Sequence, residues 1–399
     1  MTSEMDDYDR ESVELHARTH GKLSVVSRVP LVTRKDLSLA YTPGVAQVCL
    51  EIAKDPRLAH SLTLKHNTVA VVSDGSAILG IGNLGAMAAI PVMEGKAVLF
   101  KEFAGVDAFP ICVATQDAQE IIRIVRAIAP VFGGINLEDI SSPRCFEVEA
   151  GLQDIGIPVF HDDQHGTAVV VAAALLNALK VTGKDLATCR VVFNGSGASA
   201  IACARLLMSF GDLGIMPKLG DLIMCDSKGI VHLGRNDLNG HKRELAEHGN
   251  KENRTGTLSD ALVGADVFIG LSQGNLVVPD MIRLMNKAPI VFPMANPTPE
   301  IMPDLALAAG AAVIGTGRSD FPNQINNVLA FPGIFRGALD AGAITINAQM
   351  KIAAACALAD YVTAPSTDHI LPDPLDRKVA YVVAESVAAA AKQSGVCRA

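Results

Sequence analysis

The sequence predicts an α/β protein: a Rossmann-type, doubly wound parallel-sheet nucleotide domain, and a second α/β substrate domain completed by C-terminal helices. Three observations predict this class. Short apolar runs alternate with helical stretches through the middle of the chain. Two acidic pairs, Glu138-Asp139 and Asp162-Asp163, each follow a short apolar run, and a glycine pattern typical of dinucleotide-binding turns comes later, at residues 195–200.

The first part of the chain, residues 1–162, is predicted to form the substrate domain. Residues 1–65 have a mostly helical pattern, interrupted by a turn that Pro43-Gly44 forces. After that segment the pattern predicts one helix at 117–129 and strands at 69–72, 97–100, 111–113 and 131–137.

The second part, residues 163–327, is predicted to form the nucleotide domain. It opens with an almost wholly apolar and therefore buried helix at 166–179, and a second helix at 198–210 follows the glycine pattern. Strands are predicted at 190–193, 222–225, 265–270, 290–293 and 312–315. Residues 328–399, with helices around 336–362 and 377–393, have no strand pattern and are expected to return to the first domain.

Composition excludes several kinds of partner. The net charge of the 399 residues is −8 and no basic stripe is visible, so nucleic acid and anionic membranes are not expected partners. The longest apolar run, 168–176, has nine residues, far short of a membrane span. The acidic N-terminus is unlike a signal peptide, and the eight cysteines form no CxxC spacing. We expect a cytoplasmic protein with reduced cysteines.

The two acidic pairs predict a divalent-metal site. Carboxylates at the ends of parallel strands point into the crevice where open α/β sheets bind ligands. Several of them converging repel one another unless a hard cation neutralises them, and Mg²⁺ or Mn²⁺ prefers such oxygen ligands. His161 and His165 flank the second pair, but the dominance of hard carboxylates favours a structural role for both over a zinc site.

Two glycine patterns compete for the nucleotide. GxGxxG occurs at residues 80–85, and the variant Gly195-Ser196-Gly197-Ala198-Ser199-Ala200 follows a strand directly. A phosphate site needs a helix N-terminus, and a long helix is expected after Ala198, whereas Pro91 and Gly95 predict only a short one after Gly85. We therefore assign the nucleotide to 195–200 and a substrate-side loop to 80–85.

The residue that follows the next strand bears on the choice of nucleotide. Asp226 ends the run LIMCD, where a carboxylate can accept hydrogen bonds from the ribose diol of NAD. Lys228, two residues later, leaves NADP possible.

Seven blocks in family order make the chain similar to the malic enzyme family, in its short bacterial form without a fused phosphotransacetylase-like domain. The blocks are LAYTPGVA (39–46), SDGSAILGIGNLG (73–85), PVMEGKAVLFKEFAG (91–105), NLEDI (136–140), FHDDQHGTA (160–168), PMANPTPE (293–300) and FPNQINNVLAFPG (321–333).

The resemblance implies metal-dependent oxidative decarboxylation of (S)-malate to pyruvate and CO₂ with NAD or NADP and Mg²⁺ or Mn²⁺, oxaloacetate decarboxylation, and a homodimer. It also implies roles for residues: metal ligands at Glu138, Asp139 and Asp163, a catalytic tyrosine at Tyr41, a catalytic lysine at Lys96, and substrate or nicotinamide contacts at Asn296, Asn326 and Asn327. Asp162 is then a neighbour that orients a ligand or tunes the base.

The chemistry fits these residue types. A buried amine such as Lys96 can remove the hydroxyl proton of malate, and we expect it to open an apolar strand at 97–100. A tyrosine hydroxyl such as Tyr41, held by the Pro43-Gly44 turn, can protonate the enolate that remains after decarboxylation. Asn296 can bond the carboxamide or a substrate carboxylate, or simply form a turn.

Some questions stay open at this level. Larger family members carry a substrate-binding arginine where this chain has Ala77; Arg123, Arg126 or a backbone nest near Gly82-Asn83 could replace it. A malolactic or oxaloacetate decarboxylase without net redox, a nucleotide sensor and a metal-free amino-acid dehydrogenase are the competing functions.

Overall fold

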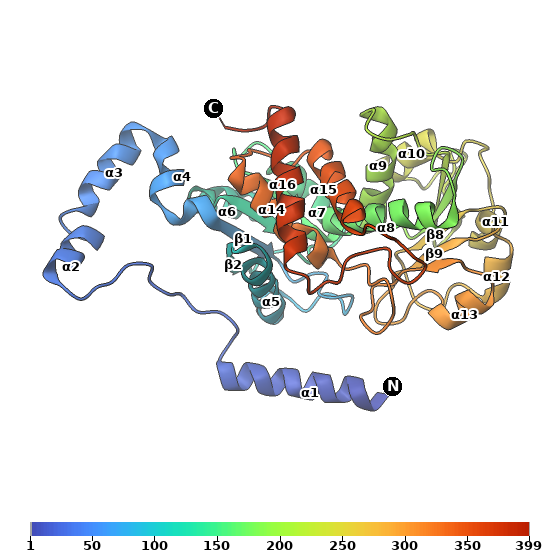
Figure 1. The fold of residues 1–399 in the computed structure, drawn as a ribbon, viewed down its shortest axis with the longest axis horizontal. Helices are drawn as coiled ribbons and strands as arrows, with labels where there is room; N and C mark the ends of the chain where they lie inside the picture. Colours follow the sequence, from blue (N-terminus) through green and yellow to red (C-terminus); the bar gives the residue numbers. More distant parts are fainter. Residues whose placement is uncertain (1, 399) are drawn as a thin grey trace.

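The computed structural model describes residues 2–398, with side chains from Asp7 onward, and contains two parallel sheets (Figure 1). The first sheet has the order β2-β1-β3-β4 and the second the order β10-β9-β8-β5-β6-β7. The strands of the first are β1 (Thr68–Ser73), β2 (Asp107–Cys112), β3 (Gly134–Leu137) and β4 (Val159–His161). Those of the second are β5 (Arg190–Asn194), β6 (Asp221–Asp226), β7 (Gly229–Ile230), β8 (Val267–Gly270), β9 (Ile290–Pro293) and β10 (Val313–Ile314). Only β7 is antiparallel to its neighbour among these pairs.

Helices cover both sheets, as the alternation of strands and helices predicts. The first sheet carries α5 (Ala86–Ala104), α6 (Ala118–Ile128), η3 (Ala129–Val131) and α7 (Arg144–Ala150). The turn η4 (Asp162–Gly166) follows β4 of the first sheet, and the helices of the second part are α8 (Thr167–Thr182), α9 (Ala198–Asp212), α10 (Gly240–His248), α11 (Leu258–Leu262), α12 (Pro279–Arg283) and α13 (Pro303–Ala308). The doubly wound architecture and most predicted elements are confirmed.

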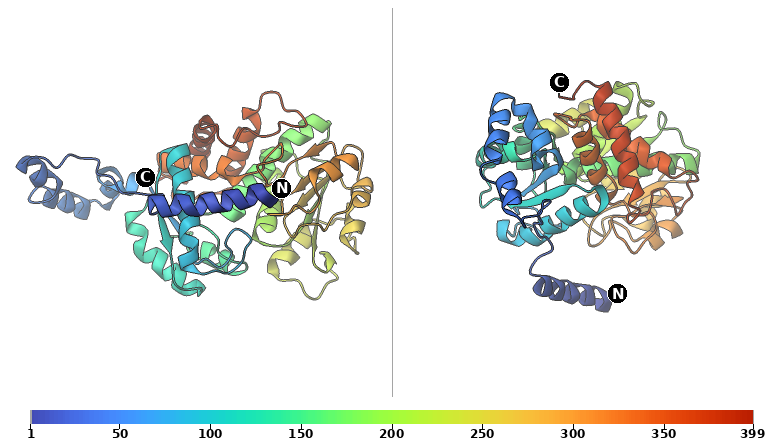
Figure 2. Two further views of the ribbon diagram at one scale, coloured as in Figure 1. Left: turned by 90° about the horizontal axis from the view of Figure 1, so that it is seen from below. Right: turned by 60° about the vertical axis from the view of Figure 1, so that its left-hand side comes forward.

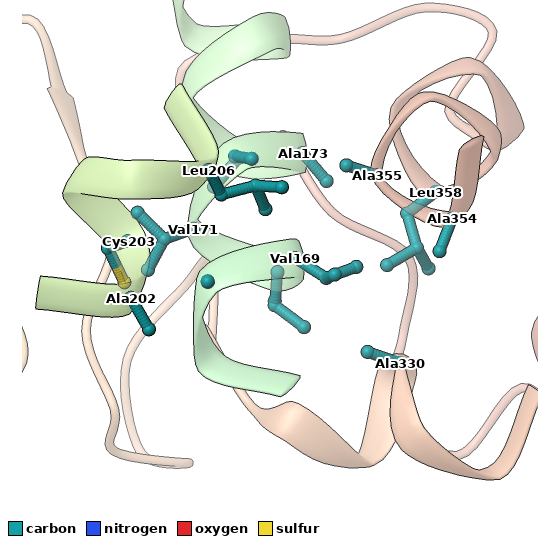
Figure 3. Packing of buried hydrophobic residues seen from close by; sticks show 14 of the residues in the cluster. Val169, Val171, Ala173, Ala202, Cys203, Leu206, Ala330, Ala354, Ala355 and Leu358 are labelled. Carbon is teal, nitrogen blue, oxygen red and sulfur yellow. The ribbon is translucent and has the colours of Figure 1, made fainter. Parts of the chain in front are cut away.

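Helix α8 forms the centre of the core. Nearly every residue from Ala168 to Leu179 is buried, because the helix is apolar on all sides. Figure 3 shows Val169, Val171 and Ala173 between side chains of α9 and of the C-terminal helices. Within residues 2–398, Asp162–Thr182 is the segment whose length and hydropathy suit a membrane span, but 72% of its most apolar window is buried inside the protein. This segment is therefore a core helix.

The C-terminal helices join the two sheets. They are η5 (Asn327–Leu329), α14 (Phe331–Asp340), α15 (Ala348–Tyr361) and α16 (Lys378–Gln393). Helix α14 packs against α5, and its Phe335 contacts Phe100 of α5 edge to face. Helix α15 packs against α8, where Asn177 donates to the carbonyl of Ala359 at 2.8 Å.

One predicted strand is wrong. Residues 97–100 lie inside α5, which runs unbroken through Pro91 and Gly95. The buried positions Ala89, Met93, Ala97 and Phe100 recur every three to four residues. The helical period over the whole segment outweighs the four consecutive apolar residues that suggested a strand.

The N-terminal helices stand away from the body (Figures 1 and 2). They are α1 (Thr2–Thr19), α2 (Arg34–Ala40), α3 (Val45–Lys54) and α4 (Ala59–Leu62), with short turns η1 (Pro56–Leu58) and η2 (Leu64–Asn67). Helices α2 and α3 have no buried residue, and the turn predicted at Pro43-Gly44 separates them. The helical character of this segment is confirmed.

Candidate active site

Three carboxylates meet at the carboxyl edge of the first sheet. Strands β3 and β4 are parallel neighbours with Leu137 paired to His161, so the residues that follow each strand leave the sheet side by side. One ligand oxygen each from Glu138, Asp139 and Asp163 can be chosen so that all lie within 4.8 Å of one another. The two acidic pairs thus converge as the strand ends predict.

The backbone around the carboxylates is unusual. Asp139 has a φ of 54°, in the left-handed region that non-glycine residues rarely adopt. Its amide donates to Oδ2 of Asp163 at 2.9 Å, which ties the two acidic segments together. Asp162 to Gly166 form a π-helical turn, a feature often found at functional sites. These local distortions hold the carboxylates toward one another.

The electrostatics of this cluster favour a cation. Burial raises the pKa of Glu138 well above its ordinary value, despite the opposing charge of Lys96. Burial and the charge of Asp163 raise the pKa of Asp139 to about 7. The Oδ2 atom of Asp139 is buried without a hydrogen-bond partner. Such an oxygen-rich, mutually repelling set suits a hard divalent ion, which would be held by Glu138, Asp139 and Asp163.

Lys96 lies in the same cluster, but on a helix and not at a strand start. Its side chain projects from α5, is buried, and sits with Nζ 3.0 Å from Oε1 of Glu138 and 2.7 Å from Oδ2 of Asp162. The ammonium also lies 4.5 Å from the ring centre of Phe331. Burial lowers the pKa of Lys96, yet Asp162, Glu138 and Asp163 outweigh it and hold the pKa above its ordinary value. A cation held by Glu138, Asp139 and Asp163 would oppose the part of that effect that comes from Glu138 and Asp163.

Asp162 contacts the lysine. Its side chain is fully buried, and Oδ2 also accepts a 2.6 Å hydrogen bond from Nδ2 of Asn327. Asn327 therefore reaches the cluster from η5, while Oδ1 of the adjacent Asn326 caps that turn by accepting from the amide of Val328 at 3.0 Å. Of the predicted asparagine pair, only Asn327 contacts the acidic cluster through its side chain.

The second glycine pattern lies next to the carboxylates. Strand β5 runs directly into Gly195, whose φ of 120° and close approach to the carbonyl of Leu271 leave no room for a side chain. Gly197 then precedes α9, so Ser196, Gly197 and Ala198 surround a helix N-terminus. Oγ of Ser199 donates to the backbone carbonyl of Asp163 at 2.7 Å. This hydrogen bond joins the glycine turn to one of the three carboxylate residues.

The prediction of a short helix after Gly85 is wrong. The helix after Gly85, α5, has 19 residues and is not short, so helix length does not separate the two patterns. The two patterns differ in how they connect to the preceding strand. Strand β5 leads directly into Gly195, whereas residues 74–85 form a loop between β1 and α5. In that loop the amide of Ala77 donates to the carbonyl of Asp139 at 3.0 Å, so the first pattern borders the carboxylates.

The carboxylate of Asp226 accepts hydrogen bonds from residues of its own chain. Each of its two carboxylate oxygens accepts two hydrogen bonds. Oδ1 accepts from Nη1 of Arg235 and from the backbone amide of Lys228. Oδ2 accepts from Nη2 of Arg235 and from Nζ of Lys242. Burial would raise the pKa of Asp226, but these hydrogen bonds lower it to about 2. Asp226 as a ribose contact stays a prediction, and its carboxylate is held in place by Arg235, Lys242 and the amide of Lys228.

Asn296 is exposed on the loop after β9. Its peptide bond to Pro297 is cis, and its carbonyl oxygen lies near Gly80 of the first glycine pattern. Buried Glu300 accepts from the amides of Ala295 and Ser272, both at 3.0 Å, and so fixes this loop beside the one after β8. Asn296 thus faces the substrate-side loop from the nucleotide side.

The candidate arginines differ in their availability. Arg126 is held by Asp154 and the carbonyl of Gly151. Arg144, to which no sequence pattern pointed, pairs with buried Asp74 at 3.0 Å beside the 74–85 loop. Asn83 exchanges hydrogen bonds with Gln116.

Tyr41, the predicted catalytic tyrosine, is not brought to the acidic cluster within this chain. It lies between α2 and α3 in the protruding N-terminal segment, and 68% of it is exposed. Figure 1 shows these helices at the opposite end of the first domain from the second sheet.

Several contacts were missed by sequence reasoning. Asn136 donates to Oε2 of Glu138 at 2.9 Å, and Ser199 and Arg235 make the contacts described above. Asn136 lies two residues before Glu138 in a strand, so it points to the same face, a signal that the sequence carried. Arg235 is nine residues beyond Asp226 in an irregular loop, and no pattern pointed to it.

This fold and site define a class of protein: a nucleotide-dependent α/β oxidoreductase whose acidic cluster suits a divalent cation. Two family models match the chain: malic enzyme, N-terminal domain, over residues 20–153, and malic enzyme, NAD binding domain, over residues 164–392. The chain belongs to the malic enzyme family.

Similar proteins are alike over nearly the full chain. The bifunctional malic/malolactic enzyme of Bacillus subtilis is 53% identical over 97% of this chain and 94% of its own length. The NAD-dependent malic enzyme of Geobacillus stearothermophilus is 55% identical over 95% of this chain and 78% of its own. Malic enzyme from Pyrococcus horikoshii superposes with a TM-score of 0.89 at 49% identity, covering 95% of this chain and 88% of that one.

Proposed function

We propose that this protein catalyses the oxidative decarboxylation of (S)-malate to pyruvate and CO₂ with reduction of NAD⁺ or NADP⁺, and that it also decarboxylates oxaloacetate. The hydrogen bond from Ser199 to the carbonyl of Asp163 carries the proposal, since it sets the nucleotide turn against the acidic cluster that holds Lys96. The relatives named NAD-dependent and NADP-dependent malic enzyme support the same reaction.

The bound groups would supply part of the chemistry: Mg²⁺ or Mn²⁺ polarises the substrate's hydroxyl and keto oxygens, and the nicotinamide accepts hydride. Glu138, Asp139 and Asp163 are the residues that would hold the cation. Gly195, Ser196, Gly197 and Ala198 leave backbone amides and an open approach for the pyrophosphate at the start of α9.

The remaining steps are proton transfers by the chain. Lys96 takes the proton of the C2 hydroxyl as hydride leaves C2, and its place among Glu138 and Asp162 holds Nζ in one position. Loss of CO₂ then leaves an enolate, and Tyr41 donates a proton to C3 to give pyruvate. Asn296 and Asn327 orient the substrate and nicotinamide from the nucleotide side.

The test is nicotinamide reduction followed by absorbance with L-malate, with both nucleotides, in the presence of Mn²⁺ and of a chelator. We expect reduced nucleotide and pyruvate in equal amounts with Mn²⁺ and loss of both with chelator. Absence of reduction with either nucleotide at saturating Mn²⁺ would exclude oxidative turnover.

A second candidate function is malolactic decarboxylation without net redox, which the name of the Bacillus subtilis relative favours. Lactate formed from malate with only catalytic nucleotide, and no accumulation of reduced nucleotide, would identify it.

We also infer a cytoplasmic homodimer that acts on a small-molecule substrate. Four of the eight cysteines are buried and all eight are free thiols, which suits a reducing compartment. We keep the division into residues 1–162, 163–327 and 328–399 as a working description of the domains.

A further inference from the structure

A polar cluster lies beside the candidate site, where three parts of the chain meet. It contains Glu149 of α7, His165 of the π-helical turn η4 and Lys351 of α15. Nε2 of His165 lies 2.7 Å from Oε1 of Glu149. Only 13% of the Glu149 side chain and 19% of the His165 side chain are exposed. The proposed reaction gives none of these three residues a role.

The carboxylate of Glu149 is ionised in this setting. Burial raises its pKa, but the interaction with His165 and the charge of Lys351 outweigh burial and lower that pKa to about 2. Burial also lowers the pKa of Lys351 to about 8, and the charge of Glu149 opposes that lowering. An ionised carboxylate has no proton to give, so His165 donates the hydrogen bond and Glu149 accepts it. Hydrogen bonds to a charged group are roughly twice as strong as neutral ones.

The imidazole of His165 has a second neighbour in Phe160, the middle residue of β4. The two ring centres lie 5.5 Å apart. Nζ of Lys351 lies 6.0 Å from the centre of the same phenylalanine ring. The imidazole thus contacts both a carboxylate and an aromatic ring, which restricts its rotation.

The turn that ends near His165 carries two residues of the candidate site. Asp162 begins the turn and accepts from Lys96 at 2.7 Å. Asp163 follows it and is one of the three carboxylates predicted to bind the metal. Gly166 lies so close to Oδ1 of Asp162 that a Cβ there would clash with it. A movement of the turn at His165 therefore displaces Asp162 as well.

Contacts from outside the turn are needed to hold it. π-helical hydrogen bonding is rare and mostly limited to single turns. Ser199 holds the backbone carbonyl of Asp163. Nε2 of Gln164 is buried and has no hydrogen-bond partner among the described residues, so that amide nitrogen gives the turn no support. The hydrogen bond from His165 to Glu149 is what ties the last part of the turn to α7.

We propose that Glu149 is a positioning residue for the acidic cluster. By accepting from His165 it fixes the turn that carries Asp162 and Asp163, and so it sets the affinity of the site for a divalent cation and the place of Lys96. The inference rests on the proposed function, because it concerns the same metal site. Replacing a residue that orients metal ligands without touching the ion typically costs about 10- to 100-fold in metal affinity or activity.

Mn²⁺ binding measured by calorimetry, without malate or nucleotide, tests the proposal. Glu149→Ala removes the acceptor, and we expect the affinity for Mn²⁺ to fall by about 10- to 100-fold. Glu149→Gln keeps an oxygen that can accept from His165, so it should retain most of the affinity. Glu147→Ala is the matched control, since Glu147 lies on the same helix but is exposed and accepts from Gln119 at 2.7 Å. It should bind Mn²⁺ like the wild type.

A double-mutant cycle separates this hydrogen bond from a general loss of packing. His165→Leu removes the donor, and the double variant Glu149→Ala/His165→Leu should bind Mn²⁺ no more weakly than either single variant, because each change removes the same interaction. Losses that add in full would overturn the proposal. A Glu149→Ala protein with wild-type Mn²⁺ affinity would overturn it too.

Urea unfolding of the same variants distinguishes positioning from folding. Glu149→Ala leaves the ammonium of Lys351 without the carboxylate that opposes its loss of charge, so a lower unfolding midpoint is expected. Lys351→Met removes that charge, and Glu149→Ala/Lys351→Met should regain stability without regaining Mn²⁺ affinity. Recovery of both would show that Glu149 acts only on folding and would overturn the proposal. Wild-type protein that binds no Mn²⁺ would reject the metal site of the proposed function together with this inference, whereas the other contrary outcomes reject this inference alone.

Discussion

Lys96 donates a 2.7 Å hydrogen bond to Oδ2 of Asp162, and both side chains are buried. Asp162 is held in turn by Asn327, so helix α5, the π-helical turn and η5 meet at one oxygen atom. The proposed base is therefore positioned by a residue that adjoins the three carboxylates predicted to bind the metal.

Replacing Asp162 should lower catalysis without abolishing the metal requirement. Asp162→Ala leaves Lys96 with Glu138 as its remaining ion-pair partner at 3.0 Å, so the amine loses one of two restraints. We expect a fall in kcat with the Mn²⁺ dependence retained, measured by steady-state kinetics over a Mn²⁺ series. Removing one member of a buried pair costs about 3–5 kcal/mol of stability, so unfolding must be measured alongside. Loss of metal binding equal to that of Asp163→Ala would show that Asp162 is itself a ligand.

Replacing Asp163 should remove metal-dependent turnover while the fold is kept. The substitution deletes one of three anionic ligands of a hard cation, and the side chain is only half-buried, so packing changes little. Mn²⁺ binding by calorimetry and activity at increasing Mn²⁺ should both be lost. Normal turnover at ordinary Mn²⁺ concentrations is the result that would refute the assignment.

Lys96→Ala should lose malate oxidation, and a small added amine should restore part of it by acting as a diffusible base. General-base catalysis contributes roughly 10² to 10⁴ in rate, so a loss of that size is expected. Lys101→Ala is the matched control: the same helix, but an exposed side chain paired with Asp107. A Lys96→Ala enzyme with near wild-type kcat would exclude the role.

Gly197→Val should weaken nucleotide binding while leaving the empty protein intact. A Cβ at Gly197 meets nothing within 4 Å and its φ of −77° suits any residue, so only the approach of the pyrophosphate is blocked. Gly82→Val should instead raise the KM for malate, because a φ of 111° forces the loop beside Asp139 to rearrange. The reverse pattern in nucleotide titrations and malate kinetics would reassign the two glycine patterns.

Gly337→Ala should destabilise the protein by about 1–3 kcal/mol, because it overpacks the contact between α14 and α16. A Cβ there would lie 2.3 Å from the carbonyl of Ala384. Gly240→Ala is the control, since nothing lies within 4 Å of its Cβ position at the start of α10. Urea unfolding should separate the two variants, and equal midpoints would show that α14 and α16 can move apart freely.

Much of the fold could be predicted because its signals are local. Strands such as 190–193 and the apolar helix α8 were predicted to within a few residues, since their side chains are buried on all sides. Helix α5 was misread because a four-residue apolar run has no period of its own, and only the spacing of Ala89, Met93 and Phe100 distinguishes helix from strand.

In the candidate site too, positions set by local sequence could be predicted, and contacts between distant segments could not. Glu138, Asp139 and Asp163 lie within two residues of a strand end, and their proximity could be predicted from sequence because parallel strands end at one edge of a sheet. Contacts between distant segments could not. The saturation of Asp226 by Arg235 and Lys242 depends on how an irregular loop folds back, and no periodic pattern encodes that.

The sequence alone thus determined the family and the fold class and predicted the candidate reacting groups, because blocks of residues and strand ends carry that information along the chain. Only the tertiary structure decided that Lys96 projects from a helix onto Asp162, that Ser199 donates to the backbone carbonyl of Asp163, and that Tyr41 lies away from both. Those relationships join segments far apart in sequence. Their distances are fixed by the packing of whole helices and sheets, which local side-chain preferences do not specify.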